Sequence, residues 1–132
     1  MKNRVLDSYA LLAYFEGEES GHKVRDLLKD AAEHDRELML CVVNWGEILY
    51  IVERREGKDK RDEIAGLMNQ MHLHIIDVDQ ELTRQAAAFK AANKMSYADC
   101  FAAALAKLKK CELVTGDKEF KEVEGDIKIH WI

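Results

Sequence analysis

The feature that most constrains the fold is a continuous apolar run from Leu38 to Val43. A strand of a parallel sheet is covered by helices on both faces, so its side chains are apolar without alternation. Further short runs are predicted as strands at 4–6, 73–78, 112–115 and 126–130. Because segments with helical spacing separate these runs, the sequence predicts an α/β fold, with a parallel five-stranded sheet flanked by helices on both faces.

The apolar spacing predicts helices at 8–15, 23–33, 44–55, 59–71, 79–93 and 96–108. Gly17 to Gly21 is predicted as a turn, and Gly57 as the end of a helix. The chain contains no proline that would interrupt a helix. Its 132 residues suit one domain, and no shift in composition divides them. We therefore expect residues 1–132 to form a single domain.

Composition restricts the function classes. The formal net charge is −5, whereas a protein that binds nucleic acid by neutralising phosphates is usually basic. Bound divalent cations would reverse the local sign. The three cysteines are far apart in apolar surroundings, which is typical of reduced core residues. No run of about 18 apolar residues occurs. We expect a soluble, cytoplasmic protein with no membrane contact.

Four acidic residues lie in apolar surroundings, although most of the 25 acids lie in charged stretches. They are Asp7, Glu47, Asp99 and Asp117. An ionised carboxylate in such surroundings is costly unless it is paired, hydrogen-bonded or bound to a metal. No run of Lys or Arg is placed to neutralise all four. A divalent cation is therefore the natural partner, since hard cations such as Mg²⁺ prefer carboxylate oxygens and water.

The four acids also share a predicted position. Asp7 and Asp117 directly follow strands, Glu47 lies one helical turn beyond another, and Asp99 is near the start of a helix. Ligands of open α/β sheets bind outside the carboxyl ends of the strands. Each acid has a structural alternative, because Asp7 and Asp117 are placed to cap the segment that follows and Ser96-x-x-Asp99 has the capping-box spacing. The coincidence of all four at one edge favours a metal site.

Four motifs follow one another along the chain: Leu6-Asp7-Ser8, Asn44-x-x-Glu47, Ser96-x-x-Asp99 and Thr115-Gly-Asp117-x-x-Phe120. In order and spacing they resemble the motifs of the PIN-domain superfamily, most closely its VapC-like toxins. The resemblance runs from about residue 3 to the C-terminus. It implies a PIN-like domain in which a cluster of acids binds Mg²⁺ or Mn²⁺.

The resemblance also implies roles for the residues of the motifs. The metal-site acids would be Asp7, Glu47, Asp99 and Asp117, of which Asp7 and Asp99 are the best candidates for direct ligands. Four further residues would have supporting roles. The hydroxyls of Ser8 and Thr115 would position waters or neighbouring carboxylates, and Glu119 would be an outer acid. Asn44 shares a helix face with Glu47 and would orient it. Lys94, Lys118 and Arg4 are candidates for contacts with RNA phosphates.

The activity that the resemblance implies is metal-dependent hydrolysis of RNA phosphodiester bonds, leaving 5′-phosphate and 3′-hydroxyl ends. A VapC-like protein would be the toxin of a type II toxin–antitoxin pair, with a cognate antitoxin and a homodimeric state. One position departs from the family: Gly116 stands where such toxins often carry a basic residue. The contact with substrate at this position is therefore unassigned.

Two other function classes remain open. A non-catalytic PIN-like interaction module would share the fold without needing the metal. A response-regulator receiver domain needs paired acids after its first strand, but Asp7 stands alone before Ser8. Asp77 would then be the phospho-acceptor, and Glu47 and Asp99 would be unexplained. The pair His72-x-His74 is interpreted as an exposed strand end, since no third ligand lies nearby.

Overall fold

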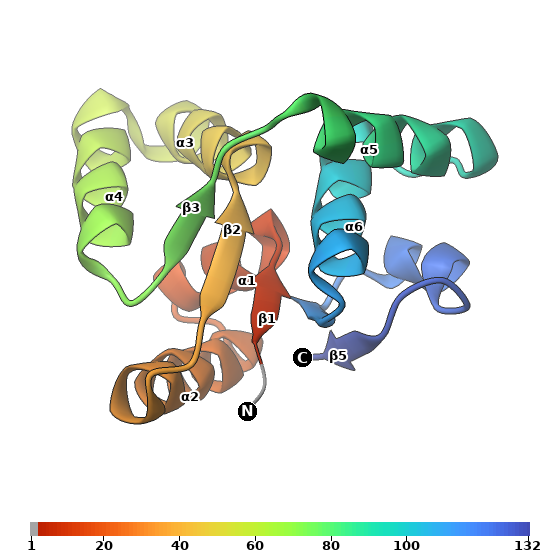
Figure 1. Cartoon of the computed structure of the whole chain (residues 1–132). Helices are drawn as coiled ribbons and strands as arrows, with labels where there is room; N and C mark the ends of the chain where they lie inside the picture. Colours follow the sequence, from red (N-terminus) through yellow and green to blue (C-terminus); the bar gives the residue numbers. More distant parts are fainter. Residues whose placement is uncertain (1–2) are drawn as a thin grey trace.

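The computed structural model describes residues 3–132, in which helices and strands alternate along the chain (Figure 1). The strands are β1 (Arg4–Leu6), β2 (Leu38–Cys41), β3 (His74–Ile76), β4 (Glu112–Thr115) and β5 (Ile129–Trp131). The helices are α1 (Ser8–Phe15), α2 (Glu19–His34), α3 (Val42–Glu56), α4 (Lys58–Gln70), α5 (Gln80–Ala92) and α6 (Tyr97–Lys109), with the 3₁₀ helix η1 (Lys118–Val123).

All five strands form one parallel sheet in the order β3-β2-β1-β4-β5. Val5 in the central strand β1 pairs with Met39 of β2 on one side and with Leu113 of β4 on the other. Their carboxyl ends therefore lie at one edge of the sheet, the upper edge in Figure 1, where α3 and α5 begin. The predicted α/β architecture with a parallel five-stranded sheet is confirmed.

Helices cover both faces of the sheet, as the apolar run predicted. Adjacent residues of the central strand point into different cores: Val5 packs with α5, α6 and η1, and Leu6 packs with α1 to α4. The same alternation separates Met39 from Leu40 in β2. Every residue of β2 is buried. The sheet therefore lies between two apolar layers, one formed with α1 to α4 and the other with α5, α6 and η1.

Two predicted boundaries were wrong. The apolar run continues to Val43, but β2 ends at Cys41 and α3 begins at Val42. A residue buried by packing is apolar in either a strand or a helix, so the run does not mark where the strand stops.

The second wrong boundary is the turn predicted for Gly17 to Gly21. The turn lies at Glu16 and Gly17, where Gly17 has φ of +69°, and Gly21 lies inside α2. A Cβ at Gly21 would lie 2.3 Å from the carbonyl oxygen of Ala13 in α1. Glycine is therefore required here because two helices pack backbone to backbone, a tertiary reason that local sequence does not show.

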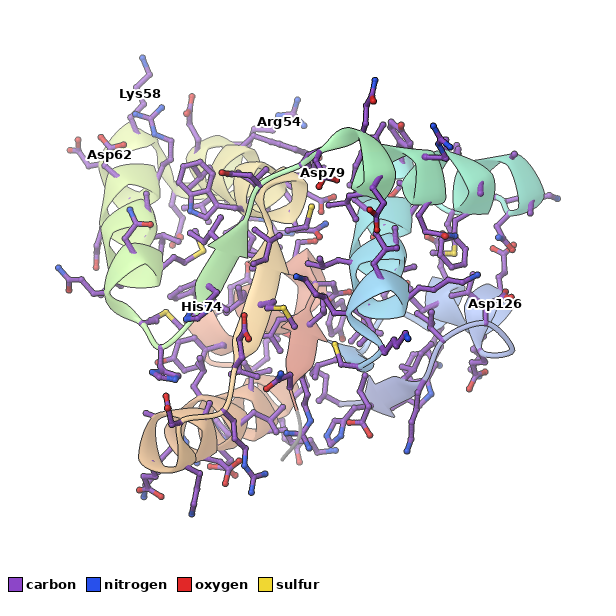
Figure 2. All side chains as sticks on the ribbon, in the orientation of Figure 1. Arg54, Lys58, Asp62, His74, Asp79 and Asp126 are labelled. Carbon is purple, nitrogen blue, oxygen red and sulfur yellow. The ribbon has the colours of Figure 1, made fainter. Side chains whose placement is uncertain are left out.

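The remaining elements agree with the sequence to within a few residues. Gly57, with φ of +92°, separates α3 from α4 as predicted. Figure 2 shows Lys58 and Asp62 of α4 pointing away from the sheet, and His74 exposed at the start of β3. The three cysteines are free thiols, two of them buried. No helix within residues 3–132 is long and apolar enough to cross a membrane.

Candidate metal centre

Five acidic side chains from four segments of the chain lie at the carboxyl edge of the sheet. Asp7 follows β1, Asp117 follows β4, and Glu119 lies in η1. Glu47 is in the second turn of α3, and Asp99 is in the first turn of α6. Because β2, β1 and β4 are neighbours in the sheet, the segments that follow their ends are brought together.

Asp7 is the most buried of these acids, with 1% of its surface exposed. Its Oδ1 accepts a hydrogen bond of 2.9 Å from the backbone N–H of Ala10, and it thereby caps α1. Its Oδ2 accepts a short hydrogen bond from the hydroxyl of Thr115 at the end of β4. Asp7 is consequently held by two elements, and its side chain has one orientation.

Thr115 links this carboxylate to the next acid. The Thr115 hydroxyl oxygen accepts a hydrogen bond of 3.0 Å from the backbone N–H of Asp117 while its proton is given to Asp7. The side chain of Asp117 in turn accepts a hydrogen bond of 3.0 Å from the backbone N–H of Glu119, and it thereby caps η1. A single buried hydroxyl therefore fixes the spacing between the carboxyl ends of β1 and β4.

Glu47 and Asn44 of α3 make contacts of different kinds. The hydroxyl of Ser8 donates to Oε1 of Glu47 over 2.6 Å, so this serine positions a neighbouring carboxylate. Asn44 is fully buried and its Nδ2 donates over 3.1 Å to the carbonyl oxygen of Ala98. Asn44 therefore ties α3 to the first turn of α6, next to Asp99, whereas the sequence suggested that it would orient Glu47.

Asp99, Asp117 and Glu119 form the tightest group of acids. One carboxylate oxygen from each can be chosen so that all three lie within 4.8 Å of one another. Asp99 is buried, Asp117 is half-buried, and Glu119 is exposed. This spacing suits oxygens that share one cation, since Mg²⁺ and Ca²⁺ bind oxygens at about 2.0–2.6 Å. Glu119, expected only as an outer acid, lies in this group.

The charges of these acids act on one another. Burial is the largest cause that raises the pKa of Asp99 from 3.8 to about 7, followed by the negative charges of Asp117 and Glu47. A hydrogen bond from Ser96 acts in the opposite direction. Sequence reasoning assigned Ser96 only to helix capping, and it does accept from the backbone N–H of Asp99. The hydrogen bond to the Asp99 side chain is a second contact, so Ser96 lies beside the carboxyl group as well as capping the helix.

The pKa of Asp7 is raised from 3.8 to about 7, mainly by burial. Hydrogen bonds from Thr115 and from the backbone of Ala10 lower it, and the charges of Asp99 and Asp117 raise it. Ionising two buried carboxyl groups that lie close together destabilises the folded protein, because each loses its hydration and repels the other. A cation among them would remove the repulsion, so the donor set, which consists of carboxylate oxygens and hydroxyls, fits a hard divalent metal.

Comparison with known proteins supports this assignment of the fold. The family model of the PIN domain matches residues 4–126. This chain belongs to the PIN domain family. None of the curated proteins matches the sequence.

Solved structures similar to this PIN domain cover nearly its whole length. A chain of VapBC2 from Rickettsia felis, bound to a DNA fragment from their promoter, has a TM-score of 0.77 at 18% identity over 98% of both chains. A chain of DNA-bound VapBC from Salmonella typhimurium has the same TM-score at 17% identity over 98% of both chains. VapC20 of Mycobacterium tuberculosis, a sarcin-ricin loop cleaving toxin, has a TM-score of 0.71 at 15% identity. The match covers 96% of this chain and 98% of that chain. At such identities the likeness is one of fold.

Several residues lie away from the acids of this PIN domain. Arg4 pairs with Glu112 over 3.2 Å at the opposite, amino ends of β1 and β4, so it is not placed to meet a phosphate at the acids. His74 lies at the start of β3 and bonds Glu37 over 3.1 Å, which fits the exposed strand end that the sequence indicated. Asp77, which a receiver domain would phosphorylate, is exposed after β3.

Proposed function

We propose that this PIN domain is a divalent-metal-dependent endoribonuclease and the toxin of a type II toxin–antitoxin pair. One observation carries the enzymatic part: acids from separate segments converge at one edge of the sheet, and two of them are buried with a pKa raised to about 7. Acidic residues without a functional role usually lie on the surface of a protein, where water hydrates the carboxylate. An arrangement that costs stability in this way is typical of a functional site.

The residues divide into those that would hold the metal and those that would hold the acids. Asp99, Asp117 and Glu119 have the spacing for a shared Mg²⁺ or Mn²⁺, with Asp7 beside them. The metal would lower the pKa of a bound water and neutralise charge on the phosphodiester. Glu47, held by Ser8, would take a proton from the attacking water, because its charge acts on Asp99 although it does not belong to the group of three acids.

The toxin assignment rests on the family and on the solved structures of similar fold. VapC20 is a toxin that cleaves the sarcin-ricin loop, and VapBC-5 of Mycobacterium tuberculosis is a member of the VapBC family of toxin–antitoxin systems. We therefore infer an RNA substrate, a cognate antitoxin and a homodimeric state for this chain. We expect this protein to purify together with the product of a neighbouring small gene. Addition of that product should stop the cleavage of RNA. Cleavage that no neighbouring product inhibits would contradict the pairing.

The experiment that tests the enzyme compares wild type with Asp99→Asn on a pool of single-stranded and structured RNAs. Asp79→Asn is the matched control. Asp79, labelled in Figure 2, also follows a strand and caps a helix, because it accepts a hydrogen bond of 2.8 Å from the backbone N–H of Leu82. It does not belong to the group of acids that could share a metal. Cutting that needs Mg²⁺ or Mn²⁺, stops with chelator, vanishes in Asp99→Asn and survives in Asp79→Asn supports the proposal.

Two other outcomes count against it. Cutting by Asp99→Asn at the wild-type rate would mean that the activity belongs to another site. No cutting by wild type freed of antitoxin, over a broad pool of RNAs, would favour a non-catalytic PIN-like interaction module. Calorimetric titration with Mn²⁺ separates these cases further, because an interaction module does not need the metal.

A further inference from the structure

Tyr9 is an exposed aromatic residue whose two neighbours in the chain are both tied to the acidic site. Ser8 donates to Glu47, and the backbone N–H of Ala10 donates to Asp7. The backbone of the first turn of α1 is therefore fixed against the acids. Tyr9 itself nevertheless remains 38% exposed.

Gly116 makes room for this ring. A Cβ at Gly116 would lie 2.4 Å from Cε1 of Tyr9, 2.9 Å from its Cζ and 3.1 Å from its hydroxyl oxygen. The outer edge of the ring consequently occupies the space that a side chain at position 116 would fill. Because Gly116 stands between Thr115 and Asp117, the ring lies beside the end of β4 where the site acids gather.

Tyr9 differs from the other exposed tyrosines in its ring contacts. The other two strongly exposed tyrosines have ring partners: Tyr97 lies 4.9 Å from Phe101, and Tyr50 lies 5.0 Å from the guanidinium of Arg54. Within residues 3–132 the Tyr9 ring has no aromatic or cationic partner. An exposed aromatic ring on a fixed turn of the backbone is suited to stack on a planar ligand.

We propose that Tyr9 is a substrate-positioning residue that stacks on a nucleobase of single-stranded RNA, next to the phosphodiester at the acids. The proposal rests on the ribonuclease function proposed above and names how that site holds its substrate. Bases of single-stranded RNA are commonly bound by stacking on aromatic side chains. Gly116 leaves the space that the ring occupies, because a larger side chain there would displace it.

The test measures cleavage and binding of a short single-stranded RNA. We expect Tyr9→Ala to raise KM and to weaken binding roughly 5- to 100-fold, with binding followed by fluorescence anisotropy in Ca²⁺ in place of Mg²⁺. Tyr9→Phe keeps the ring and retains affinity close to wild type. Mn²⁺ affinity is unchanged in both variants, because Tyr9 donates no hydrogen bond to the acids. Leu67→Ala, which removes an exposed apolar side chain on α4, is the control without effect.

Two further comparisons separate stacking from a structural role. Replacing single bases by abasic sites along the RNA should identify one position that weakens binding to wild type but not to Tyr9→Ala. Gly116→Ala should weaken RNA binding by displacing the ring and have no further effect when combined with Tyr9→Ala. Gly66→Ala, where a Cβ meets nothing within 4 Å, is its control.

The outcomes distinguish this inference from the proposed function. If wild type cuts RNA and Tyr9→Ala has the same KM and affinity, the stacking role is wrong and the ribonuclease stands. If every abasic position weakens both proteins equally, Tyr9 acts through the fold and the stacking role is again wrong. If wild type binds Mn²⁺ but neither binds nor cuts RNA, the proposed function fails and the stacking role fails with it.

Discussion

In the metal-free protein, Asp7→Asn should raise stability at alkaline pH. The folded pKa of Asp7 is about 7, against an ordinary value of 3.8. The folded state therefore keeps a proton between about pH 4 and pH 7 that the unfolded state has already released. Stability consequently falls as the pH rises through this window. The same direction holds for Asp99, whose pKa is also raised to about 7.

The size of the effect follows from the two pKa values. The difference between 3.8 and about 7 corresponds to roughly 4 kcal/mol over the whole window. Between pH 5 and pH 8 the Asp7 contribution to the free energy of unfolding falls by roughly 2–3 kcal/mol. For a domain of this length that is a fall in Tm on the order of 10 °C.

Asparagine at position 7 removes the ionisation but keeps an oxygen that can accept from Ala10. It loses an acceptor for Thr115, at a cost of about 1–2 kcal/mol at every pH. We therefore expect Asp7→Asn to match wild type near pH 5 and to be more stable by roughly 2 kcal/mol at pH 8. Asp79→Asn replaces an exposed helix cap and should follow wild type at both pH values.

The assay is urea unfolding followed by circular dichroism, in chelator, at pH 5 and pH 8. Repeating it at pH 8 with Mn²⁺ should stabilise wild type by mass action and leave Asp7→Asn nearly unchanged. A stability difference between wild type and Asp7→Asn that is the same at both pH values would refute the argument, because Asp7 would then be only a helix cap. Equal stabilisation of both proteins by Mn²⁺ would exclude Asp7 from the metal site.

Three further predictions follow from single contacts. Gly21→Ala should lower the free energy of unfolding by about 1–3 kcal/mol, because its Cβ would lie 2.3 Å from the carbonyl oxygen of Ala13; urea unfolding measures it. Glu119→Gln should weaken Mn²⁺ binding in calorimetry, and an unchanged affinity would remove Glu119 from the metal group. Thr115→Val removes a hydrogen bond that lowers the pKa of Asp7, so the acidic limb of the cleavage rate should move to higher pH; an unmoved limb would show that Asp7 does not control it.

The fold was predictable from the sequence because burial on both faces has a direct signature. The unbroken run at β2 and the alternation of strands with helices were sufficient for a parallel five-stranded sheet. Local boundaries were less predictable. Val42 and Val43 look like strand residues, yet they begin α3, and Gly21 looks like a turn residue, yet it is the contact between two helices. Both are decided by tertiary packing, which overrides local preference.

The candidate site was predictable in its acids and not in their connections. Asp7, Glu47, Asp99 and Asp117 stood out because each is charged in apolar surroundings. The route of the hydrogen bonds could not be read from spacing, since Thr115 reaches Asp7 across 108 residues. The ring of Tyr9 beside Gly116 is a contact of the same kind, since it joins α1 to the end of β4 across more than 100 residues of sequence.

The structural and the functional interpretations of these acids turn out to be compatible. A carboxylate offers about four lone-pair directions on two oxygens. Asp7 uses one direction to cap α1 and a second to accept from Thr115, which leaves the others for a cation. Asp117 caps η1 through Oδ1 and also belongs to the group that lies within 4.8 Å. Capping at the carboxyl edge of the sheet therefore orients these carboxylates for a metal, so evidence for a cap at this edge does not count against a metal site.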